Sequence, residues 1–201
     1  MPNGSPSLAK SILSDALFLK KDVRTQAKEW VEESIEPGAK LALDWSFFMP
    51  RLAFSREQLE EKLQLARQDH HFSRAEVRRL EFLLTKRDSS KKGYHLYFLS
   101  REREENQFLF GRPTISFNVD ELKDKKINYV LITQVQKGYP PAEFYDKLRE
   151  RAELVKRFSP YRDSTREYPI DSQPLTGGPF LWKELLARER NGQPIEVYRL
   201  K

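Results

Sequence analysis

The chain has 201 residues, of which 38% are hydrophobic and 33% charged, so it is long enough for one domain with a substantial core. Its formal net charge of +6 comes from 36 basic and 30 acidic residues that are mixed along the sequence. Because there is no cysteine, disulfides, thiol nucleophiles and thiolate metal sites are excluded, and no apolar run reaches the roughly 18 residues of a membrane-spanning helix.

The first residues, 1–21, are expected to form an arm that precedes a single α/β domain over residues 22–201. Within the arm, Leu8, Ile12, Leu17 and Leu19 recur at loosely helical spacing, which predicts an amphipathic helix. Two roles are open for this helix. It can dock on the domain, or it can connect the domain to a membrane.

The segment over residues 22–45 predicts a helix, a stop and a strand. Asp22 can cap the helix, Pro37 and Gly38 end it, and residues 41–45 then form a buried strand. Apolar residues three and four positions apart form one stripe along this helix: Val23, Ala27, Trp30, Val31 and Ile35.

The rest of the chain alternates between helical and extended patterns. Ser55 with Gln58, and Ser73 with Glu76, have the spacing of capping boxes at helix starts. We expect helices over 55–68, 73–87, 119–126, 142–152 and 180–190, the last one stopped by Gly192, and strands over 91–100, 106–117, 127–133, 153–159 and 195–200. This order predicts a layered, mostly parallel α/β sheet flanked by helices, with an antiparallel edge strand near the C-terminus.

Few residues have the spacing that catalysis or metal binding requires. His70 and His71 are adjacent and would face different ways on a helix, and His95 lies within a strand. Asp44 is the main candidate, because it ends a predicted central strand, at the edge where open α/β sheets bind ligands. A structural role for Asp44 remains open, and Asp22 and Arg24 are interpreted as a helix cap and its salt-bridge partner. We expect no metal ion and no cofactor.

The loop from Ser159 to Pro179 offers a second candidate surface. Its arginines and tyrosines supply hydrogen-bond donors and flat faces that suit phosphate or sugar: Tyr161, Arg162, Arg166 and Tyr168. A simple connecting loop is the alternative interpretation. Nucleic-acid binding is not favoured, because no strand carries the mixed basic and aromatic pattern of a base-stacking platform.

Four blocks of the sequence resemble, in the same order, the soluble segment that follows the last membrane span in many bacterial integral-membrane glycosyltransferases. These enzymes form the clan of protein mannosyltransferases and aminoarabinose transferases. The blocks are "DVRTQAKEWVEESIEPGAKLALD", "INYVLIT", "FYDKLRERAELVKRFSP" and "RERNGQPIEVYRL". Glu36 stands where the family pattern has proline, and Gln193 interrupts its Gly-Pro pair.

The resemblance implies a non-catalytic, extracytoplasmic C-terminal domain that covers or gates the membrane active site and helps to position acceptor or donor. The implied partners are the membrane-embedded part of the same polypeptide, an anionic membrane surface and a polyprenyl-phosphate-linked sugar. The arm over 1–21 would then be the connector to a missing membrane part. The alternative from the residues is a free-standing α/β ligand-binding or enzymatic module with its site at the carboxyl ends of the strands.

Overall fold

The computed structural model describes residues 6–44, 49–68, 72–86, 92–100, 108–109, 112–133, 141–165 and 180–201. Seven helices lie in these ranges: α1 (Pro6–Phe18), α2 (Val23–Ser34), α3 (Arg56–Gln68), α4 (Arg74–Lys86), α5 (Val119–Asp124), α6 (Ala142–Arg151) and α7 (Phe180–Ala187). The strands are β1 (Lys40–Asp44), β2 (His95–Ser100), β3 (Phe108–Leu109), β4 (Arg112–Ser116), β5 (Tyr129–Thr133), β6 (Ala152–Phe158) and β7 (Ile195–Leu200).

The strands form one sheet in the order β3-β4-β2-β1-β5-β7-β6. Strands β4, β2, β1 and β5 run parallel, whereas β7 is antiparallel to β5 and to β6. The predicted mostly parallel sheet with an antiparallel C-terminal edge is therefore confirmed. The edge consists of two strands, with β6 outermost, and β7 is consequently buried on both faces along its first four residues.

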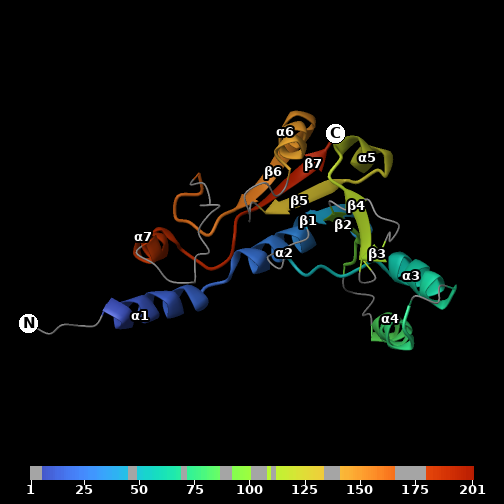
Figure 1. Cartoon of the computed structure of the whole chain (residues 1–201), viewed down its shortest axis with the longest axis horizontal. Helices are drawn as coiled ribbons and strands as arrows, with labels where there is room; N and C mark the ends of the chain where they lie inside the picture. Colours follow the sequence, from blue (N-terminus) through green and yellow to red (C-terminus); the bar gives the residue numbers. More distant parts are fainter. Residues whose placement is uncertain are drawn as a thin grey trace, which may run out of the picture.

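Helices cover both faces of the sheet (Figure 1). One core lies between α2 and the face that carries Leu41, Leu43 and Leu131. The second lies under α5 and α6, where Val130 and Ile132 are buried. The α3–α4 hairpin lies beside the β3–β4 end of the sheet, and α1 contacts α7 at the opposite end (Figure 1).

Local signals in the sequence explain the start and end of α2. The Asp22 carboxylate accepts a hydrogen bond of 2.7 Å from the backbone N–H of Thr25, as a helix cap should. Val23, Ala27 and Val31 of its apolar stripe are buried. The chain leaves the helix through Gly38, whose φ of +81° is a conformation that favours glycine.

Two sequence predictions are wrong in detail. The last helix, α7, ends at Ala187 and not at residue 190, and Gly192 packs against Val23 of α2 instead of stopping the helix. The strand expected over 106–117 is instead two antiparallel strands, β3 and β4, and Pro113 of β4 pairs with Phe108 of β3. In the described ranges, no helix is long and apolar enough to cross a membrane.

Candidate functional site

The fold places Asp44 where ligands bind in open α/β sheets. From β1 the chain proceeds to β2 and β4 on one side, whereas β5 lies on the other side of β1. The carboxyl ends of β1 and β5 therefore flank the point where the strand order reverses, and such a point is the usual binding site in this class of fold. Asp44 ends β1 and Thr133 ends β5.

At this edge, Asp44 joins the two strands. Its side chain is 1% exposed, and its Oδ2 accepts hydrogen bonds from the backbone N–H of Thr133 at 3.1 Å and from the Thr133 hydroxyl at 2.8 Å. A carboxylate buried this deeply is stabilised by such donors. The contacts match the structural role that the sequence left open for Asp44. They also fix the geometry of this edge of the sheet, which we call the switch-point edge because the strand order reverses there.

A second buried carboxylate lies in the same row of the sheet. Leu43 pairs with Leu131, and Ile132 pairs with Glu196 of β7, so Asp44 and Glu196 fall in one row with β5 between them. Neighbouring strands are about 4.8 Å apart, so the two backbones are about 10 Å apart. Glu196 was not predicted from the sequence, because the row that it shares with Asp44 depends on how β5 pairs with β7.

Glu196 accepts hydrogen bonds from two tyrosine hydroxyls and forms an ion pair with an arginine. Its Oε2 accepts hydrogen bonds from the hydroxyl of Tyr145, and from that of Tyr198 at 2.8 Å, while Nε of Arg157 lies 3.4 Å from its Oε1. Burial, followed by the bond to Glu196, raises the pKa of Tyr145, and burial raises that of Tyr198, so both hydroxyls stay protonated and can donate. The cluster therefore provides a fixed polar support beside the edge.

The arginines add positive charge to this side of the sheet. The guanidinium carbon of Arg149, an exposed residue of α6, lies 4.3 Å from the centre of the Tyr145 ring. Arg157 retains 28% side-chain exposure. These two guanidinium groups balance the formal charge of the two buried carboxylates, Asp44 and Glu196.

The second predicted surface, over 159–179, is only partly described. Arg166 and Tyr168 lie outside the described residues. Tyr161 is 3% exposed, and its hydroxyl donates to Glu184 of α7, so its side chain supports the fold. Arg162 is exposed, and its backbone N–H donates to the carbonyl of Ala187. Of the described residues of this set, Arg162 is therefore the one that a ligand can reach.

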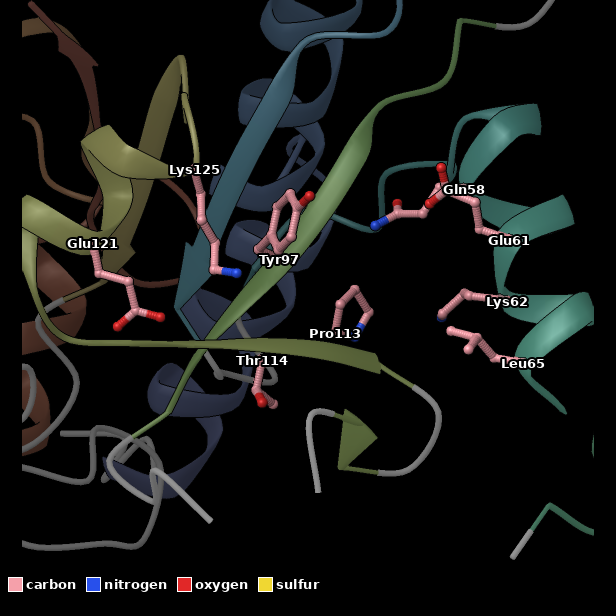
Figure 2. Close-up of a pocket in the computed structure, with 9 residues that line it drawn as sticks. All are labelled: Gln58, Glu61, Lys62, Leu65, Tyr97, Pro113, Thr114, Glu121 and Lys125. Carbon is pink, nitrogen blue, oxygen red and sulfur yellow. The ribbon is translucent and has the colours of Figure 1, made fainter. Parts of the chain in front are cut away.

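A hollow of about 240 Å³ opens between α3, the β2–β4 face of the sheet and α5, as Figure 2 shows. Its lining is polar and of mixed charge: Gln58, Glu61, Lys62, Leu65, Tyr97, Pro113, Thr114, Glu121 and Lys125. Burial, and to a smaller extent the charge of Glu61, raises the pKa of Tyr97. Opposite charges in similar number give this hollow no clear preference for an anion or a cation.

Gln58 has a role at this hollow that the sequence did not predict. Its backbone N–H is capped by the Ser55 hydroxyl oxygen at 3.1 Å, but its side chain does not complete a capping box. Instead it donates to the Leu96 carbonyl at 2.9 Å and accepts from the Leu96 N–H at 2.8 Å. The amide thereby replaces a neighbouring strand for one residue of β2. At the next helix, Ser73 and Glu76 form the complete box.

We expect Gln58→Ala to lower the free energy of unfolding by about 2 kcal/mol, because it leaves a buried donor and a buried acceptor of Leu96 unpaired. Gln64→Ala, on an exposed position of the same helix, is the matched control and should change stability by less than about 0.5 kcal/mol. Urea unfolding of both variants measures the difference. Equal effects of the two substitutions would show that the contacts of Gln58 with Leu96 do not contribute to stability.

No three His, Asp or Glu side chains gather into a possible metal site within the described ranges. Comparisons with protein-family models, with curated proteins and with solved structures find no match to this chain. The fold and the candidate edge therefore define the class, an open α/β domain with a polar switch-point edge.

Proposed function

We propose that this chain is a non-catalytic, extracytoplasmic C-terminal domain of a bacterial integral-membrane glycosyltransferase that uses a polyprenyl-phosphate-linked sugar. It covers or gates the active site of the membrane part and helps to position acceptor or donor. One observation carries the proposal. The four sequence blocks that carry the resemblance contain β1, β5, β6 and β7, and these are four adjacent strands of the sheet.

The first and last blocks also meet outside the sheet. The backbone N–H of Val23, at the start of α2, donates to the carbonyl of Asn191 at 3.0 Å. Likewise, the N–H of Glu189 donates to the carbonyl of Pro160 at 2.8 Å, which joins the third block to the fourth. Patterns matched by chance would be scattered over a fold, so their union in one contiguous half supports a common origin.

The buried carboxylates support a structural rather than a catalytic role for this domain. Asp44 holds the ends of β1 and β5, Glu184 holds Tyr161 and Arg188, and Glu196 holds two tyrosines. An acid or base in catalysis must instead reach a proton of the substrate. Exposed cations such as Arg162 would instead contact the phosphate of the sugar donor.

The natural reading frame tests the proposal most directly. We expect the gene to encode, upstream of this segment, about ten or more apolar spans of roughly 20 residues each. The purified 201-residue chain should transfer no sugar from a polyprenyl-phosphate donor, whereas the full-length protein should do so. A reading frame without such spans, or transfer by the isolated chain, would refute the proposal.

The switch-point edge favours a second candidate, a free-standing α/β module that binds its ligand beside Asp44 and Thr133. Both residues lie where this class of fold binds ligands. This candidate predicts a reading frame with no membrane spans. It also predicts that a ligand found by screening protects the protein against thermal unfolding, and that Asp44→Asn weakens this protection. Protection that is unchanged in Asp44→Asn would place the ligand elsewhere.

A further inference from the structure

The outer face of α4 is basic and apolar at the same time. Successive residues of an α-helix are rotated by about 100°, so Arg74, Arg78 and Phe82 follow one another on one side of α4 within about 80°. Arg79, Leu83 and Lys86 lie beside these three residues around the helix axis, and they widen the same surface. All six residues are exposed; for the two apolar ones, the exposed fraction is 60% at Phe82 and 40% at Leu83. We call these six residues the α4 face.

The position of α4 in the fold leaves this face outward. None of its residues is buried, and α4 packs on α3, at the end of the molecule away from α1 and α7 (Figure 1). Its half-buried side is the opposite one, which carries Val77, Leu80 and Leu84. Phe82 and Leu83 are therefore not covered by the core of the domain.

The acidic residues of α4 do not neutralise the face. Glu76 accepts hydrogen bonds from the backbone N–H and the hydroxyl of Ser73, both at 2.8 Å, at the start of the helix. Glu81 forms a 2.7 Å salt bridge with Arg67 of α3. Arg74, Arg78 and Lys86 form no salt bridge with another residue of the described ranges, so their charge is available to an external anion.

We propose that the α4 face docks on an anionic lipid bilayer, with the cations against the headgroups and Phe82 inserted at the boundary with the acyl chains. The combination is what an interfacial helix requires, because basic residues are attracted to anionic headgroups while apolar side chains gain from burial. The proposal rests on the proposed function for the presence of a membrane beside the chain.

The outline of the molecule agrees with this docking. In Figure 1, α1 and α4 lie toward the same edge of the view at its two ends, and α5 and α6 lie at the opposite edge. A bilayer along the first edge would contact α1 as well as α4. The large apolar residues exposed on and just after α1 are Leu8, Ile12, Phe18 and Leu19.

Vesicle sedimentation tests the proposal with the purified chain. We expect binding to vesicles of phosphatidylcholine mixed with phosphatidylglycerol, weakening as salt is added, and little binding to phosphatidylcholine alone. Each cation near the surface contributes about fivefold to the partition coefficient, so Arg74→Gln combined with Arg78→Gln should lower it about 25-fold. Phe82→Gln should lower it several-fold through loss of the apolar contact.

The matched control is Lys123→Gln combined with Lys201→Gln, which removes the same charge from exposed positions in α5 and at the C-terminus. This variant should keep most of the binding, and circular dichroism should show that all variants remain folded. Equal loss in the control, no binding by the parent chain, or tighter binding to a nucleic acid that Phe82→Gln leaves unchanged would each overturn the proposal. The reading-frame result is independent, so failure of either proposal is recognised separately.

Discussion

Glu184→Ala is expected to lower the free energy of unfolding by about 4 kcal/mol, the largest effect of any single substitution considered for this chain. Glu184 and Arg188 are each 6% exposed, and the Glu184 Oε1 accepts from the Arg188 Nε at 3.1 Å and from the Tyr161 hydroxyl. Removing the carboxylate leaves a buried guanidinium without this counter-charge and a buried hydroxyl without its acceptor.

A neighbouring ion pair gives the control for this prediction. Glu189 pairs with Arg190 at 2.9 Å, but the Glu189 side chain is 40% exposed, so Glu189→Ala should cost no more than about 0.5 kcal/mol. Urea unfolding of both variants compares two glutamate-to-alanine substitutions that lie five positions apart. Glu184→Gln should fall between them, since it retains an acceptor but loses the charge. Similar losses for Glu184→Ala and Glu189→Ala would contradict the assignment.

Gly192→Ala is expected to cost about 3 kcal/mol, for two separate reasons. The φ of Gly192 is +110°, a backbone conformation that residues with a side chain rarely adopt. A Cβ at this position would also lie 2.9 Å from the Cβ of Val23 and 3.2 Å from its backbone nitrogen. Because Val23 begins α2 and is fully buried, relief would require the helix to move away from the segment before β7.

Gly38→Ala separates the two reasons. The φ of Gly38 is +81°, but a Cβ there would meet no atom within 4 Å, so only the backbone cost of about 1 kcal/mol applies. Thermal unfolding should therefore show a clearly larger fall in Tm for Gly192→Ala than for Gly38→Ala. If the two falls were equal, the contact with Val23 would have no energetic weight.

The sequence predicts the elements with strong local signals. For α2, the cap at Asp22, the stripe through Val31 and the stop at Gly38 all act within a few residues, and the structure places each as expected. β5 is predicted for the same reason, since an apolar run rich in β-branched residues needs little context. The mixed parallel and antiparallel sheet follows from the alternation of such elements.

Features that depend on distant partners escape this kind of prediction. Gln58 fits a capping box in the sequence, yet its amide binds Leu96, 38 residues away, because on the side of β2 away from β1 the described pairing with β4 begins only at Phe98. The ring of Tyr161 suits sugar contact by composition, but the Tyr161 hydroxyl is bound to Glu184.

Of the two buried carboxylates at the candidate edge, only Asp44 could be predicted from the sequence. Asp44 could be placed there because a strand end in a parallel sheet is defined by the strand itself. Glu196 could not, because its place in the same row as Asp44 depends on the register of β7 against β5.

The place of β7 has a consequence for the order in which the chain folds. β7 follows β5 and β6 in the chain but lies between them, so among the described strands β6 joins the rest of the sheet through β7. During synthesis on the ribosome, residues 152–158 can therefore pair with β7 only after residues 195–200 have been synthesised. Such long-range closure slows folding, and until β7 is synthesised the edges of β5 and β6 that pair with it stay open.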